Sequence, residues 1–194
     1  MRIGIDVDDT LLDFVGNYIL FHNQMYETKL ERADFKTYSF NHAKGGTMEQ
    51  EVNTLKQFYN TDFFREMLPF PGAVEIIQKL KEENKLFVIT SRPLYIRDGT
   101  LKQLSEHFSG AFLDVFFSSN YYAQAKNSGK TKAEICKDLE IALLIDDSLE
   151  YAKQCAKEKI RVFLFGNNNP WNQNGIVERV KRVKDWKEIG DLLI

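Results

Sequence analysis

Five short apolar runs, separated by helical patterns, most constrain how this chain can fold. The runs span residues 3–7, 86–89, 113–117, 141–145 and 160–165. Most of them lack the alternation of a half-buried strand, which favours strands covered on both faces, as in a parallel sheet. Helical stretches with apolar residues at 3.6-residue spacing lie between them. The alternation of strand and helix predicts an α/β fold with a doubly wound, mostly parallel sheet.

One connection is too long for a single crossover helix. About 80 residues separate the first apolar run from the second, whereas a crossover with one helix needs about a dozen or a few more. Within this stretch, residues 14–26 and 48–59 are amphipathic, with a loop around 41–46 between them. We therefore expect a small helical cap over residues 14–68, inserted after the first strand into an α/β core of residues 1–13 and 69–194.

The composition is that of a folded protein without a strong charge. The 194 residues include 43% hydrophobic residues, 28 acids and 26 basic residues, so the formal charge is −2. No basic field attracts a nucleic-acid polymer or an anionic membrane.

No apolar run is long enough to span a membrane, and acids stand where a signal peptide needs apolar residues. We expect a cytoplasmic protein with Cys136 and Cys155 as reduced core thiols; the sequence leaves open whether two chains form a homodimer.

Polar residues end three of the five predicted strands. Side chains at positions i and i+2 of a strand share a face, so the first two acids after the first strand can point at one atom. A single acid or threonine after a strand is more often a helix cap or turn residue. Three such ends favour a ligand site, because ligands bind at the carboxyl edge of a doubly wound sheet. The residues are Asp6, Asp8, Asp9, Thr90, Ser91, Asp146 and Asp147.

Acids gathered at one edge require a counter-charge. Oxygen ligands without His or Cys select a hard ion, and we expect Mg²⁺ held partly by water and a phosphate. Lys130 follows Gly129 at the predicted opening of a helix, where the helix dipole disfavours a cation. This position indicates an anion nearby, the alternative being a solvated lysine. A P-loop is excluded because Gln124 stands where its first glycine is needed.

These residues resemble the haloacid dehalogenase-like (HAD) phosphatase superfamily. Asp6-Val7-Asp8-Asp9-Thr10 is similar to its first motif, Thr90 to its second, Lys130 to its third and Asp146-Asp147 to its fourth. Residues 63–73, 143–147 and 182–186 further resemble the 5′(3′)-deoxyribonucleotidases. Ser128 and Thr10 stand where we expect arginine and valine in the animal enzymes. The arginine difference bears on base and sugar selectivity rather than on the reaction.

The resemblance implies a phosphomonoesterase that hydrolyses (deoxy)nucleoside monophosphates through an aspartyl-phosphate intermediate. Asp6 would be the nucleophile and Asp8 the general acid and base, while Thr90 and Lys130 hold the phosphoryl oxygens. The resemblance also implies a Mg²⁺ site, held by Asp6, Asp146 and the main-chain carbonyl of Asp8, with Asp147 supporting its water shell or orienting Lys130. Further predicted substrate-binding residues are Thr10, Ser91, Arg92 and Tyr121.

The predicted cap is rich in aromatic residues. Most of them are expected to pack in its core, and one or two facing the site would suffice to stack on a nucleobase. A HAD phosphatase for another small phosphomonoester, such as a sugar phosphate, is the first alternative. A phosphoacceptor signalling domain is disfavoured because its acceptor acid ends the middle strand, where this chain has Ser118, Ser119 and Asn120.

Overall fold

A six-stranded parallel sheet forms the centre of the molecule. The computed structural model describes residues 1–37, 45–119, 129–166, 169–173, 175 and 177–194. The strand order is β3-β2-β1-β4-β5-β6, and every pair is parallel, which confirms the predicted doubly wound α/β fold. The strands are β1 (Arg2–Ile5), β2 (Lys85–Thr90), β3 (Asp114–Phe117), β4 (Leu143–Asp146), β5 (Arg161–Phe165) and β6 (Val180–Val183).

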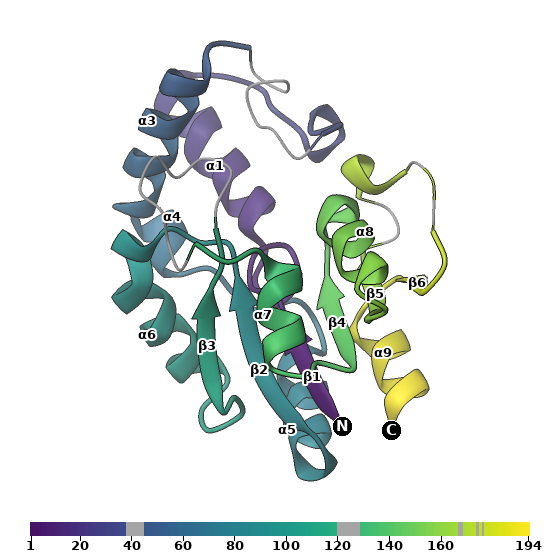
Figure 1. Cartoon of the computed structure of the whole chain (residues 1–194). Helices are drawn as coiled ribbons and strands as arrows, with labels where there is room; N and C mark the ends of the chain where they lie inside the picture. The colour runs from purple at the N-terminus through teal and green to yellow at the C-terminus, as the bar shows by residue number, and fades with distance from the viewer. Residues whose placement is uncertain (38–44, 120–128, 167–168, 174, 176) are drawn as a thin grey trace.

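Helices cover both faces of this sheet (Figure 1). Strand residues such as Ile3 and Ile5 belong to a buried cluster with Ile77 of one helix and Ile189 of another. Residues of the opposite strand face, such as Ile89, pack in a second cluster. The first cluster includes residues of α5 (Ala73–Glu83), α6 (Arg97–His107) and α9 (Trp186–Leu193), and the second includes residues of α7 (Lys132–Asp138) and α8 (Leu149–Lys157).

The sixth strand is absent from the sequence prediction. Val180 and Val183 are buried, but Lys181 and Arg182 lie between them. Four residues with two charges give a weak apolar signal, which is common for edge strands. Pairing with β5, where Val162 is the register partner of Val180, decides that this segment is a strand.

The inserted segment stands beyond the carboxyl ends of the strands (Figure 1). Its elements are α1 (Phe14–Tyr26), η1 (Arg32–Asp34), α3 (Met48–Tyr59) and α4 (Asp62–Arg65). The bounds of α1 and α3 are those expected from the sequence; residues 41–44 of the predicted loop lie outside the described residues. Aromatic rings fill its interior: the ring centroid of Phe58 lies 5.2 Å from that of Phe14 and 5.5 Å from that of Tyr18.

The two ends of the insertion lie side by side. Phe70 N donates to the carbonyl of Leu11 at 2.9 Å, and Asp13 N donates to the carbonyl of Leu68 at 3.4 Å. These bonds coincide with the predicted boundaries after residue 13 and before residue 69. The buried aromatic rings of the insertion nevertheless belong to the same apolar cluster as β1. A separate cap domain over residues 14–68 therefore stays a prediction.

The remaining described elements are two short 3₁₀ helices, η2 (Leu94–Ile96) and η3 (Pro170–Asn172). Among the described residues, no helix combines the length and apolar character needed to cross a membrane. Cys136 and Cys155 are buried free thiols, as expected.

Trp186 joins α9 to the loop that follows β1, and its loss tests this contact. Its side chain is fully buried, and its indole Nε1 donates to the carbonyl of Thr10 at 2.9 Å. Trp186→Ala leaves a cavity and an unpaired carbonyl, so we expect the free energy of unfolding to fall by about 3 to 5 kcal/mol in urea titrations. The exposed neighbour Lys187 provides a control, since Lys187→Ala should change it by less than about 0.5 kcal/mol. Equal losses of unfolding free energy for the two variants would contradict a stabilising role of the Trp186 contact.

Candidate active site

The carboxyl ends of β1 and β4 bring three acids together. Ile5 and Ile145 are register partners on these neighbouring strands, and Asp6 N donates to the carbonyl of Ile145 at 2.9 Å. Asp6 therefore lies beside Asp146, and Asp147 follows. One carboxylate oxygen from each acid lies within 4.8 Å of the others, and all three residues are buried. The prediction that acids distant in the chain meet at this edge is confirmed for Asp6, Asp146 and Asp147.

A buried lysine pairs with two of these acids. Lys132 Nζ lies 2.9 Å from Asp6 Oδ1 and 2.6 Å from Asp146 Oδ2, and its side chain is fully buried. The centroid of the Tyr151 ring is 4.6 Å from the same nitrogen. Burial lowers the pKa of Lys132, but the charges of Asp146 and Asp6 raise it by more, so the net pKa lies above its ordinary value. The ammonium group therefore stays charged within the site.

Lys130, the lysine chosen from the sequence, lies elsewhere, and this prediction is corrected. Its side chain is 57% exposed, and its Nζ bonds Asp138 Oδ2 at 2.6 Å. The carboxylate of Asp138 raises the pKa of Lys130 by hydrogen bonding and by its charge. The physical reason for the correction is the start of α7: Thr131 is its N-cap and Lys132 its first residue, whereas the sequence reading opened the helix at Lys130.

A local signal could have located this helix start. The Thr131 side chain accepts from Glu134 N, and the Glu134 side chain accepts from Thr131 N, which is a capping box. The pattern Thr-x-x-Glu before an apolar stretch is visible in the sequence. It places the N-cap at Thr131 and makes Lys132 the residue that opens the helix.

Asp147 has a different partner from its neighbour. Its Oδ2 accepts from the indole Nε1 of Trp171 at 2.9 Å. Burial raises the pKa of Asp147 well above the ordinary range, and the charges of Asp9 and Asp146 raise it further. Trp171 was not among the predicted site residues, because its place in η3, far along the chain, carries no motif.

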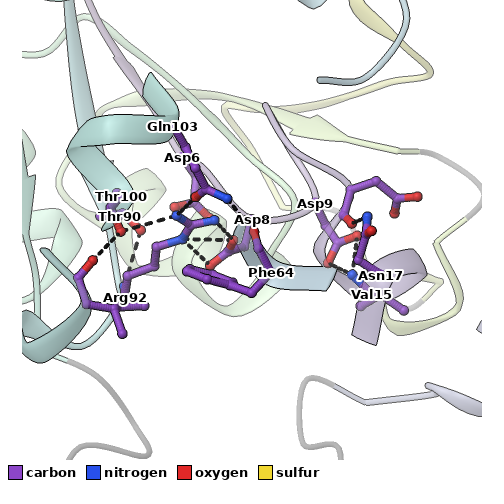
Figure 2. A network of polar contacts seen from close by, with 12 residues as sticks. Asp6, Asp8, Asp9, Val15, Asn17, Phe64, Thr90, Arg92, Thr100 and Gln103 are labelled. Carbon is purple, nitrogen blue, oxygen red and sulfur yellow. Dashed lines mark hydrogen bonds and ion pairs between the residues drawn. The ribbon is translucent and has the colours of Figure 1, made fainter. Parts of the chain in front are cut away.

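Asp8 pairs with a buried arginine, as Figure 2 shows. Arg92 Nε lies 3.0 Å from Asp8 Oδ1 and 3.1 Å from Asp8 Oδ2, and Arg92 Nη2 lies 2.6 Å from Oδ1. The Arg92 side chain is fully buried, and its guanidinium nitrogens bond Asp8, Thr100 and Gln103, so the structure shows Arg92 bound within the protein and its substrate contact stays a prediction. Asp8 is not in the three-acid group that can share a cation among the described residues. The expected contribution of the Asp8 main-chain carbonyl to a metal site stays a prediction.

The other predicted site residues differ in their contacts. Thr90 Oγ1 accepts from Arg92 N at 3.2 Å, a bond within the turn that follows β2. The pairing of β2 with β1, in which Val88 is the register partner of Ile5, brings this end of β2 next to the acids. Ser91 Oγ lies 2.8 Å from Ser118 Oγ. Thr10 is buried, and its hydroxyl has no hydrogen-bond partner among the described residues. Tyr121 lies outside the described residues.

Asp9 is held on the side of the insertion. Its carboxylate accepts from Val15 N at the start of α1 and from Arg32 Nη1, at 3.2 Å in the latter case. Burial raises the pKa of Asp9 to about 8, although Arg32 opposes the shift. Arg32 also contacts Asp13 and was not predicted from the sequence.

The three-acid group is consistent with a divalent cation. If all three acids are ionised, Lys132 balances one charge and two negative charges remain. Asp147 Oδ1 is buried without a hydrogen-bond partner among the described residues, and Asp6 Oδ1 makes its ion pair without an aligned hydrogen bond. Burial raises the pKa of Asp6 to about 7, with Lys132 opposing and Asp146 adding to the shift. Carboxylate oxygens with unused lone pairs suit a hard cation.

The family model described as "5' nucleotidase, deoxy (Pyrimidine), cytosolic type C protein" matches residues 1–194. The chain belongs to this nucleotidase family. A Bacillus cereus protein named "Putative nucleotidase" is 25% identical over 197 residues, covering all of this chain and 98% of the relative.

Two solved structures share the fold. A haloacid dehalogenase-like hydrolase from Streptococcus pneumoniae superposes with a TM-score of 0.69 at 12% identity, covering 98% of this chain and 97% of the other. A HAD-hydrolase from Bacillus subtilis, solved bound to magnesium, gives 0.65 at 18% identity, covering 99% and 97%. The nucleotidase is therefore a phosphomonoester hydrolase with a HAD-like fold.

The raised pKa values predict how pH and a divalent cation affect the stability of the nucleotidase. Asp6 has a folded pKa of about 7, against about 4 when unfolded. Between these values the folded state binds more protons, so without a cation the stability falls as pH rises. A cation needs the ionised carboxylates, so its stabilising effect should be larger at pH 8 than at pH 5.5. With saturating Mg²⁺ at pH 8 we expect the melting temperature to rise by roughly 5 to 10 °C.

This prediction is checked by thermal melts at both pH values, in chelator and in Mg²⁺. Asp146→Asn removes an oxygen of the three-acid group, so it should reduce the Mg²⁺ effect at pH 8. Asp138→Asn alters only the exposed pair with Lys130 and should leave the effect intact. An equal effect of Mg²⁺ at both pH values would contradict the assignment of the cation to these acids.

Proposed function

We propose that this nucleotidase hydrolyses (deoxy)nucleoside monophosphates in a Mg²⁺-dependent reaction through an aspartyl-phosphate on Asp6. The observation that carries the proposal is the buried Asp6 carboxylate at the end of β1, paired with a charged lysine and adjacent to two further acids. The family description, which names a deoxy, pyrimidine 5′ nucleotidase, supports a nucleotide as the substrate. The cytosolic type in the same description supports a cytoplasmic location.

Electrostatics sets the main requirement of this reaction. A carboxylate about 4 Å from a phosphate charge meets roughly 4 kcal/mol of repulsion per charge pair at an effective dielectric constant near 20. Lys132 offsets part of this repulsion because its charge already lies 2.9 Å from Asp6 Oδ1. Asp6, Asp146 and Asp147 would hold Mg²⁺, together with the main-chain carbonyl of Asp8. When bound, the ion supplies positive charge that neutralises the phosphoryl oxygens and keeps Asp6 ionised.

Asp6 and Asp8 act in both steps of the proposed reaction. A carboxylate oxygen of Asp6 attacks phosphorus and the bond to the ester oxygen breaks, while Asp8 gives that oxygen a proton. Water then attacks the phosphorus of the aspartyl-phosphate, Asp8 takes a proton from it, and phosphate leaves with the Asp6 carboxylate restored. Lys132, in place of Lys130, and the hydroxyl of Thr90 would hold phosphoryl oxygens in both steps. We propose supporting contacts from Thr10 and Ser91.

A phosphate-release assay over a panel of substrates tests the function. Deoxynucleoside monophosphates, ribonucleoside monophosphates and sugar phosphates are compared, each with Mg²⁺ and with chelator. We expect nucleotides to be turned over fastest, chelator to stop release, and Asp6→Asn to lower kcat by more than about 10⁴-fold because the nucleophile is lost. Equal or better turnover of sugar phosphates would overturn the nucleotide assignment.

A matched pair of lysine variants tests the composition of the site. Lys132→Met removes the buried cation and should lower kcat by about 10²- to 10³-fold, since one preorganised contact to the transition state is lost. Lys130→Met changes an exposed side chain and should alter kcat by less than about twofold. Circular dichroism and melting temperatures establish that both variants are folded. The reverse order of effects would return the role to Lys130.

A further inference from the structure

Arg92 is a fully enclosed charge beside Asp8, the proposed general acid and base. It lies two residues after Thr90, the last residue of β2, and its side chain has no exposed surface. Burying a charged pair usually brings little net stability, because desolvation offsets the attraction. Hydrogen bonds on both sides of its guanidinium group, however, fix its orientation.

One side of the guanidinium group holds the carboxylate of Asp8. Asp8 Oδ1 accepts hydrogen bonds from Arg92 Nη2 at 2.6 Å and from Arg92 Nε at 3.0 Å. Asp8 Oδ2 accepts one of these three bonds, from Arg92 Nε at 3.1 Å. The guanidinium group therefore binds Oδ1 more strongly than Oδ2, and Oδ2 keeps more of its capacity to accept a further hydrogen bond or a proton. The Asp8 side chain is 21% exposed, so the pair is not sealed from the surface.

The other side of the guanidinium group leads to the inserted segment. Arg92 Nη1 donates to Gln103 Oε1 at 2.7 Å and to Thr100 Oγ1 at 3.2 Å, both on α6. Gln103 Nε2 in turn donates to the main-chain carbonyl of Phe64 in α4. The Phe64 ring also lies against the guanidinium group, with its centroid 4.9 Å from Arg92 Cζ. Figure 2 shows this chain of contacts from Gln103 through Arg92 to Asp8.

We propose that Arg92 is a positioning residue that holds Asp8 Oδ1, so that Oδ2 exchanges the proton, and that Gln103 makes this hold depend on α4. The inference rests on the proposed function, in which Asp8 moves protons in both steps. In the first step the proton passes from Oδ2 to the ester oxygen as the bond to phosphorus breaks. In the second it returns to Oδ2 from the attacking water. Arg92 itself touches neither the substrate nor the phosphorus.

The leaving group provides the decisive measurement. Phenyl phosphate and p-nitrophenyl phosphate are similar in shape, but nitrophenolate departs readily without a proton. Their kcat/KM values are compared because this quantity reports the first phosphoryl transfer. Arg92→Lys keeps the charge but loses the paired hydrogen bonds from Nε and Nη2 to Asp8. We therefore expect kcat/KM for phenyl phosphate to fall about 100-fold. The loss with p-nitrophenyl phosphate should be about tenfold or less.

Gln103→Met extends the test to the link with α4. Methionine fills similar space and removes the bonds to Arg92 and to the Phe64 carbonyl, so we expect the same substrate dependence at about a tenfold loss. Arg97→Lys is the matched control, because Arg97 opens α6 with a 53% exposed side chain; it should leave both substrates unchanged. If Arg92→Lys does not fold, as melting temperature shows, Gln103→Met decides the outcome.

A double-mutant cycle separates positioning from a structural role. If Arg92 acts through Asp8, adding Arg92→Lys to Asp8→Asn should cost less than about twofold, because the group it positions no longer transfers protons. Multiplicative losses, or equal losses with both aryl phosphates, would overturn the inference. Asp6→Asn is measured in parallel: retained activity there would refute the aspartyl-phosphate itself, while an inactive Asp6→Asn with substrate-independent Arg92 effects refutes only the positioning role.

Discussion

The ion pairs of Lys132 with Asp6 and Asp146 are the interaction on which the rest of the site depends. They lie where the carboxyl ends of two neighbouring parallel strands meet, and all three side chains are buried. Without Lys132, the adjacent acids would repel one another in a poorly solvated place, and burial already raises the pKa of Asp6 to about 7. The lysine therefore makes a dense group of acids compatible with a folded protein. With all three acids ionised, two negative charges remain, which suit a divalent cation.

The acids after β1 are distributed among separate basic partners. Asp6 pairs with Lys132 from the start of α7, Asp8 with Arg92 from the end of β2, and Asp9 with Arg32 from η1. Each partner comes from a different part of the chain, so this short loop is held from three directions. Such an arrangement gives each carboxylate its own orientation, which the proposed nucleophilic role of Asp6 and acid–base role of Asp8 require.

The inserted segment takes part in this arrangement through several polar contacts. Arg32 reaches Asp9 from η1, and the Phe64 carbonyl of α4 reaches Arg92 through Gln103. The segment also shares its apolar core with one face of the sheet. It is thus joined to the first motif both by packing and by polar contacts, and most of its aromatic residues serve that packing.

The sequence by itself determined the features that depend on local pattern. Apolar runs predict the five strands from β1 to β5. Amphipathic spacing predicts both ends of α1 and α3, because the burial of one helix face follows from periodicity along the chain. The acids at the ends of β1 and β4 were predictable for a related reason: the carboxyl ends of parallel strands share one edge.

Only the tertiary structure decided which basic residue serves which acid. Lys130 and Lys132 are lysines two positions apart. The capping box places Lys132 at the start of α7, but only the packing shows that Lys132 is buried against Asp6 while Lys130 is exposed beside Asp138. Arg92 follows a strand end like a substrate contact, yet α6 and Phe64 enclose it. Arg32, Trp171 and the pairing of β6 depend likewise on segments distant in the chain. Long-range packing sets desolvation and the direction of a side chain, and neither is written in the local sequence.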